Sequence, residues 1–315
     1  MHLALWLTAF ILKTQAQRIV VDTILLIACW YIAPWLWLPV LGSFVGSLLG
    51  VFTWDLWRSH TLAPPTPPNS RRPHTLYAHG LHSTPEQFFH WTRQTAANGG
   101  RTTRPMVMKS ELFPMLPLVP DDSPSWAVPA APWPNLSIGY GHDVVIFREH
   151  LHRIMEDTTE QLVLFGFSRG TATVLNTLAA AQPNAGRIKG VILLGAFASA
   201  QDVIAFRRKE RWLWACLWPI VAFIQEKMYG PAALDPANAP ITNVAHIPSG
   251  IPIYIVASQG DRDVPYTSAV KLHAALCAAG KNAALITLKN TPHEMATATG
   301  EDRATLERVF AEVYA

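Results

Sequence analysis

Charged side chains are scarce in this sequence of 315 residues. Only 15% of them are Asp, Glu, Lys or Arg, well below the quarter that is usual in soluble domains. The formal net charge at pH 7 is +3, which is too small to indicate a protein that binds nucleic acid. The apolar excess is uneven, and much of it lies before residue 58.

Cysteine is also scarce, and its three copies, Cys29, Cys216 and Cys277, are far apart in the chain. Without a paired spacing they predict neither a disulfide framework nor a metal-binding cluster. Burial as small apolar side chains is the preferred interpretation of all three. We therefore expect no metal ion and no cofactor.

Apolar sequence is abundant at the N-terminus. Residues 19–57 form a long apolar run that is interrupted by Asp22 and by two prolines. A single helix of this length would measure nearly 60 Å, which is about twice the hydrocarbon core of a bilayer. We therefore expect residues 1–60 to be a membrane-embedded helical segment that breaks at Pro34 and Pro39.

Positive charges flank this apolar run on both sides. Lys13 and Arg18 precede it, and Arg58, Arg71 and Arg72 follow it. This distribution favours a transmembrane or re-entrant hairpin with both ends, and the domain that follows, in the cytoplasm. One span with an interfacial helix is the alternative.

Three glycines in the membrane segment, Gly42, Gly46 and Gly50, are spaced by four residues. Such a stripe lets another helix approach closely. The partner would be the other arm of the hairpin or a second copy of the protein. A chance set of small residues in an apolar helix explains the spacing equally well.

A proline-rich linker, residues 61–73, precedes a second domain over residues 74–315. Strand-like and helical patterns alternate along this domain. The expected strands cover 74–80, 105–109, 161–165, 188–194, 252–257 and 284–288, and the expected helices cover 85–97, 141–160, 171–181, 266–279 and 303–313. This alternation predicts an α/β fold with a doubly wound, mostly parallel sheet.

The strand at 161–165 is followed by Gly166-Phe167-Ser168-Arg169-Gly170 and then by a helical run. A G-x-S-x-G sequence between a strand and a helix is typical of a nucleophile elbow. The glycines leave room for a serine on a very tight turn. The motif therefore predicts Ser168 as a catalytic nucleophile, against the alternative of an ordinary glycine-rich turn.

A serine nucleophile needs a base, and the base needs a carboxylate that orients it. His293 follows the last expected strand, and Asp261 and Asp263 follow the strand before it. The chain order Ser, Asp, His is the order that the elbow motif predicts.

With these motifs, residues 74–315 resemble a serine hydrolase of the α/β-hydrolase fold, of the esterase or lipase type. In that family the acid often lies in a D-x-x-V-P stretch, which residues 261–265 match. The resemblance implies Asp261 as the acid, with Asp263 and Asp202 as alternatives.

The resemblance also implies an oxyanion hole and a cap. The backbone N–H groups of Arg169 and Leu81 are the expected oxyanion donors. A helical cap insertion is expected at about residues 201–250. Its basic cluster at 207–211 and the tryptophan-rich run at 212–224 suit either a membrane interface or a helix packed on the core.

These features predict a membrane-anchored serine hydrolase that cleaves an ester or related acyl bond, with a lipid-like or acylated substrate. Ser168 would attack the carbonyl, His293 would accept the serine proton, and Asp261 would orient His293. An acyltransferase would use the same triad with an alcohol or a lipid as acceptor. A non-catalytic subunit that assembles a membrane complex is an alternative of another class.

Overall fold

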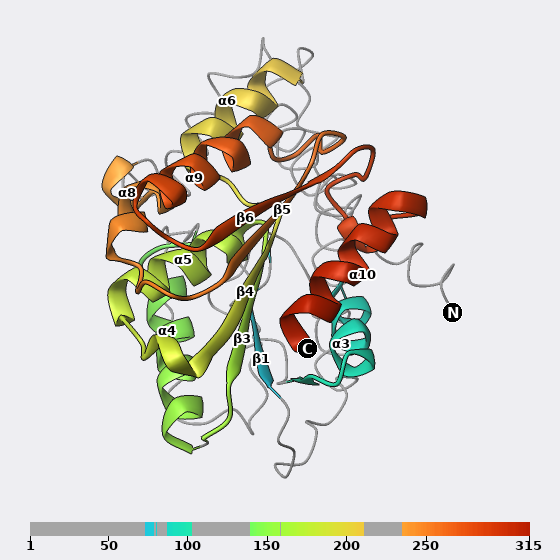
Figure 1. The fold of residues 1–315 in the computed structure, drawn as a ribbon. Helices are drawn as coiled ribbons and strands as arrows, with labels where there is room; N and C mark the ends of the chain where they lie inside the picture. The colour runs from blue at the N-terminus through green and yellow to red at the C-terminus, as the bar shows by residue number, and fades with distance from the viewer. Residues whose placement is uncertain (1–72, 79, 81–86, 103–138, 158, 211–234) are drawn as a thin grey trace, which may run out of the picture. The chain divides into compact units, whose positions relative to one another are not determined.

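A computed structural model describes residues 73–78, 80, 87–102, 139–157, 159–210 and 235–315 (Figure 1). All of these residues belong to the unit that runs from residue 63 to residue 315. The expected membrane segment at 1–60, with its glycine stripe, lies outside the described ranges. Within those ranges, no helix combines the length and the apolar character that a membrane span requires.

The centre of the domain is a parallel sheet of six strands. The strands are β1 (His74–Ala78), β2 (Arg101–Thr102), β3 (Leu162–Phe167), β4 (Ile188–Leu194), β5 (Ile253–Ser258) and β6 (Ala283–Leu288). They lie in the order β2-β1-β3-β4-β5-β6, and every neighbouring pair is parallel. The carboxyl ends of all the strands therefore meet at one edge, where ligand sites of such sheets form.

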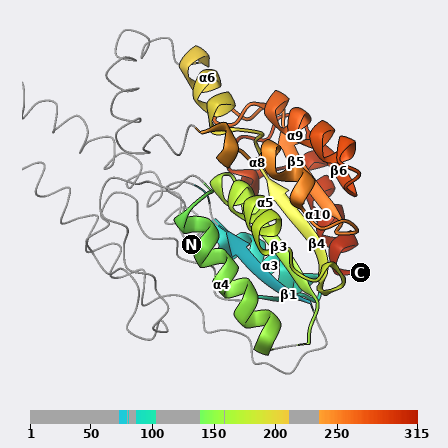
Figure 2. The same cartoon turned by 90° about the vertical axis from the view of Figure 1, so that its left-hand side faces the viewer.

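Helices cover both faces of this sheet. The described helices are α3 (Gln87–Ala97), α4 (His142–Asp157), α5 (Arg169–Ala181), α6 (Ala200–Glu210), α8 (Pro240–Asn243), α9 (Tyr266–Ala278) and α10 (Gly300–Tyr314). Side chains from α4, α5 and α9 share one buried cluster with the sheet, and side chains from α3 and α10 share another. Figure 2 shows α4 and α5 in front of the strands that they cover.

The alternation of side chains along β3 explains why the strand is apolar throughout. Leu162 and Leu164 belong to the cluster under α4, α5 and α9, whereas Val163, Phe165 and Phe167 belong to the cluster under α3 and α10. A parallel strand with helices on both faces has no side exposed to water. The doubly wound parallel sheet that the sequence predicts is therefore confirmed.

The expectation that all three cysteines are buried is wrong at Cys277. Its side chain is exposed on α9, where the thiol lies 3.4 Å from Nε2 of His273.

Several other details differ from the sequence-based expectations. The short strand β2 was not predicted, because Arg101 and Thr102 carry no apolar pattern, and the predicted strand at 105–109 lies outside the described residues. Helix α10 begins at Gly300 rather than at 303, with Glu301 and Asp302 in its first turn, where carboxylates stabilise a helix N-terminus.

Only part of the expected cap insertion at 201–250 is described. It contains α6, two short 3-10 helices (Pro236–Asn238 and Val244–His246) and α8. Residues 211–234, which hold the tryptophan-rich run, lie outside the described ranges. The cap therefore remains a prediction.

Candidate active site

Ser168 lies on a sharp turn between β3 and α5. Its backbone has φ 52° and ψ −118°, and a non-glycine residue at positive φ carries strain of about 1–3 kcal/mol. The turn is held because the Ser168 N–H donates to the Leu194 carbonyl at 2.8 Å and the Thr171 hydroxyl donates to the Ser168 carbonyl at 2.7 Å. This is the strained geometry of a nucleophile elbow.

Gly166 allows the tight return of the chain after this turn. A Cβ atom at this position would lie 2.8 Å from the Gly170 carbonyl oxygen and 2.8 Å from the Thr171 Cα. Both neighbours are backbone atoms that cannot move aside. The steric reason for a glycine two residues before the serine, which the sequence predicts, is therefore confirmed at Gly166.

Asp261 and His293 lie on the loops that follow β5 and β6. The Nδ1 atom of His293 and the Oδ2 atom of Asp261 are 2.7 Å apart, and the Asp261 side chain is buried. The other carboxylate oxygen of Asp261 accepts backbone N–H groups from Asp263 at 2.8 Å and Val264 at 2.9 Å. With Nδ1–H donating to the carboxylate, Nε2 of His293 keeps a lone pair that can accept a proton.

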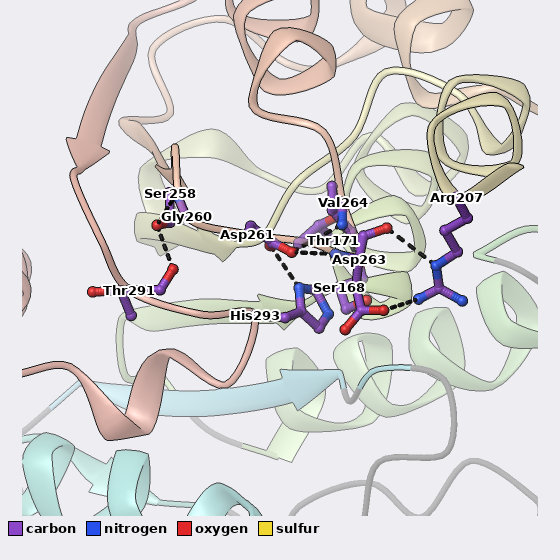
Figure 3. A network of polar contacts seen from close by, with 10 residues as sticks. All are labelled: Ser168, Thr171, Arg207, Ser258, Gly260, Asp261, Asp263, Val264, Thr291 and His293. Atoms are coloured by element: carbon purple, nitrogen blue, oxygen red, sulfur yellow. Dashed lines mark hydrogen bonds and ion pairs between the residues drawn. The ribbon is translucent and has the colours of Figure 1, made fainter. Parts of the chain in front are cut away.

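The imidazole of His293 packs against residues that flank the elbow. Its ring centroid lies 5.0 Å from that of Phe167, which directly precedes Ser168. A Cβ at Gly195, the residue after β4, would lie 3.0 Å from Cε1 of His293. Figure 3 shows Ser168, His293 and Asp261 together at the carboxyl edge of the sheet.

The two alternative acids have other partners in the structure. Asp263 lies 3.2 Å from the Arg207 guanidinium of α6, and its backbone carbonyl accepts a hydrogen bond from Arg207 Nε at 3.1 Å. Asp202 accepts from the Ser268 hydroxyl at 2.7 Å and from Lys271 Nζ at 2.9 Å. Of the three predicted acids, Asp261 is therefore the one that contacts His293.

Of the two predicted oxyanion donors, only one lies within the described residues. Arg169 directly follows Ser168 and begins α5, so its backbone N–H lies at the positive end of the helix dipole. Leu81 lies outside the described ranges. The oxyanion hole therefore stays a prediction at both positions.

The side chain of Arg169 has a role that the sequence did not indicate. Its Nε lies 3.8 Å from Oδ2 of Asp143, and both side chains are buried. Asp143 also accepts the Gly139 N–H at 2.9 Å, and Asn176 of α5 donates to the Gly139 carbonyl at 2.7 Å. These contacts join the start of α4 to the first turns of the helix that follows the elbow.

No metal centre is found in the part of the chain that the structure describes. No group there of three or more His, Cys, Asp or Glu side chains is placed to hold a metal ion.

Comparison with known proteins gives a fold but no sequence relative. No family model matches the sequence, and no curated protein matches it. Among solved structures, 2,6-dihydroxy-pseudo-oxynicotine hydrolase matches with a TM-score of 0.50 and 13% identity, over 80% of this chain and 63% of that chain. An acylaminoacyl peptidase of Pyrococcus horikoshii matches with a TM-score of 0.52 and 13% identity, over 78% of this chain and 38% of that chain.

An acylaminoacyl peptidase in complex with Z-Gly-Gly-Phe-chloromethyl ketone also matches, with a TM-score of 0.52, 15% identity and coverage of 79% of this chain and 37% of that chain. The matches span less than two thirds of the length of each of these three proteins. At such low identities the likeness shows the fold alone. Together with the parallel sheet, it assigns this chain the α/β-hydrolase fold.

Proposed function

We propose that this protein is a serine hydrolase that cleaves an ester or a related acyl bond. The observation that carries the proposal is the 2.7 Å contact between His293 and Asp261, beside a serine held at positive φ on a strand-to-helix turn. A serine hydroxyl becomes a nucleophile when a neighbouring imidazole, oriented by a carboxylate, can take its proton.

In the proposed reaction, Oγ of Ser168 attacks the substrate carbonyl carbon while Nε2 of His293 accepts the hydroxyl proton. The negative charge that develops on the carbonyl oxygen is stabilised by the backbone N–H groups of Arg169 and Leu81. His293 then donates its proton to the leaving group, and an acyl-enzyme forms. Water, deprotonated by His293, releases the acid and regenerates Ser168. Asp261 accepts the hydrogen bond from Nδ1–H of His293 and holds the imidazole in one tautomer.

A fluorophosphonate probe tests this proposal directly, because it reacts with activated serines and forms a stable covalent adduct. We expect the full chain, solubilised in detergent, to be labelled, and labelling to vanish in Ser168→Ala. In His293→Ala the labelling rate should fall by about a thousandfold or more, since triad members act as a unit.

Matched controls come from the end of the second 3-10 helix of the cap region and from the turn after it. Ser249→Ala and His246→Ala remove the same side-chain types from exposed positions and should label like the wild type. Labelling that survives in Ser168→Ala would mean a different nucleophile. A folded wild type that no acyl or phosphonyl probe labels would favour the non-catalytic assembly role.

We also propose that the protein is attached to a membrane by residues 1–60 and acts on lipid-like or acylated molecules. The support is the apolar run and the basic residues on both sides of it. After alkaline carbonate extraction of cell membranes, the full chain should stay in the membrane pellet. Complete release into the supernatant would contradict insertion, and would leave the proposed hydrolase chemistry unaffected.

A further inference from the structure

The loops that carry Asp261 and His293 touch each other directly. A Cβ at Gly260 would lie 2.9 Å from the carbonyl carbon and 3.1 Å from the Cα of Asn290. Gly260 directly precedes Asp261, and Asn290 lies three residues before His293. The relative position of the proposed acid and base is therefore determined where these two loops meet.

A buried serine joins the two loops at this contact. Ser258, the last residue of β5, is 1% exposed. Its hydroxyl donates to the Thr291 backbone carbonyl of the histidine loop and accepts the Gly260 N–H of the acid loop at 3.1 Å. Figure 3 shows the hydrogen bond between Ser258 and Thr291. A hydroxyl can do both because it has a donor and acceptor lone pairs.

A carboxylate in the first turn of α10 holds the histidine loop from the other side. Asp302 accepts the Lys289 N–H at 2.9 Å, the Asn290 N–H at 3.0 Å and the Thr291 hydroxyl at 2.7 Å. Partial burial acts to raise the pKa of Asp302, but these hydrogen bonds outweigh it and hold the pKa below its usual range. The carboxylate is therefore charged at neutral pH and binds three consecutive residues of the loop.

We infer that Ser258, Thr291 and Asp302 form a clasp that sets the position of His293 relative to Asp261 and Ser168. The three residues are positioning residues, because none of them contacts the proposed reacting atoms. The inference rests on the proposed function. A misplacement of about 1 Å in a catalytic group can lower a rate by as much as about a hundredfold, so loosening the clasp should reduce turnover more than substrate binding.

The test uses the full chain in detergent and p-nitrophenyl esters of increasing acyl length. Thr291→Val removes the hydroxyl that donates to Asp302, whereas Thr291→Ser keeps a hydroxyl at the same position. Asp302→Asn replaces one acceptor oxygen with an amide group that cannot accept the loop N–H. Glu301→Gln is the matched control, because the carboxylate of Glu301 binds only the exposed Lys289 side chain among the described contacts.

We expect kcat to fall about tenfold in Thr291→Val and Asp302→Asn with KM changed less than about twofold, and the rate of fluorophosphonate labelling to fall in parallel. Thr291→Ser and Glu301→Gln should keep wild-type kcat. The double variant of Thr291→Val and Asp302→Asn should lose little more than Asp302→Asn alone, because Asp302→Asn already weakens the hydrogen bond that Thr291→Val removes.

Ser258→Ala breaks a different hydrogen bond of the clasp, between its hydroxyl and the Thr291 carbonyl, and should also lower kcat. If Thr291→Val, Asp302→Asn and Ser258→Ala all keep the wild-type kcat, the proposed clasp is wrong, whereas the proposed triad is unaffected. Equal losses in Thr291→Ser and Thr291→Val would also overturn it, since the hydroxyl would then not matter. A wild type that neither turns over esters nor reacts with the probe would instead overturn the proposed function, and this inference with it.

Discussion

At the scale of single residues, Gly195 combines a left-handed backbone conformation with a position directly beside the proposed catalytic base. It follows β4 at φ 65°, and its N–H donates to the Val256 carbonyl at 2.9 Å. A Cβ there would lie 3.0 Å from Cε1 and 3.4 Å from Nδ1 of His293. The absence of a side chain at Gly195 therefore leaves the space that the imidazole occupies.

We predict that Gly195→Ala displaces the His293 ring by a few tenths of an ångström and lowers kcat about tenfold, with little change in KM. The matched control is Gly280→Ala, which has nearly the same φ, 67°, and no atom within 4 Å of the added Cβ. Both variants should lose about 1–2 kcal/mol of stability from the left-handed backbone. Ester hydrolysis and thermal unfolding, measured side by side, separate the two effects, and equal kcat in both variants would contradict the prediction.

At the scale of helices and strands, the sequence was most informative where an element is buried on both faces. Strand β4 has the bounds 188–194 that its apolar run predicts, because a parallel strand covered by helices must be apolar throughout. Element ends were less predictable, since they depend on local hydrogen bonds. The Asp302 carboxylate, for example, lies in a turn of α10 that the apolar pattern alone did not include.

The candidate site shows the same limit. Ser168, Asp261 and His293 could be predicted, because each follows a strand and the carboxyl ends of parallel strands meet at one edge. Asp143 and Asp302 could not, because their contacts join residues that lie far apart in the chain or on elements with no recognisable motif. Only tertiary packing brings such groups together, and no spacing in the sequence predicts these contacts.

At the scale of the whole described domain, a buried cluster of hydroxyl groups ties the first strand to the last helix. The Tyr314 hydroxyl lies 2.5 Å from Oγ1 of Thr75 in β1 and 3.3 Å from Oγ1 of Thr95 in α3. The Tyr77 hydroxyl lies 2.7 Å from Thr95 Oγ1. Burial raises the pKa of Tyr314 to about 12 and raises that of Tyr77 well above 10.

These shifts predict how the stability of the domain depends on alkaline pH. The folded protein keeps both phenol protons to a higher pH than the unfolded chain, whose tyrosines titrate near pH 10. Above that pH the folded state binds more protons, so the free energy of unfolding falls as the pH rises. Tyr314 alone should account for a loss of about 2–3 kcal/mol between pH 10 and pH 12, and below pH 9 its contribution should be constant.

Tyr314→Phe tests this at the same scale. The variant should lose about 1 kcal/mol at neutral pH from the missing hydrogen bonds, and its stability should fall less steeply above pH 10 than that of the wild type. Denaturant unfolding at a series of pH values can be followed by far-UV circular dichroism. Tyr266→Phe, which removes a surface hydroxyl paired with Thr287, is the control for the loss of one phenol. If the free energy of unfolding falls equally steeply above pH 10 in Tyr314→Phe and in the wild type, the prediction is wrong, because ionisation of Tyr314 then does not destabilise the folded domain.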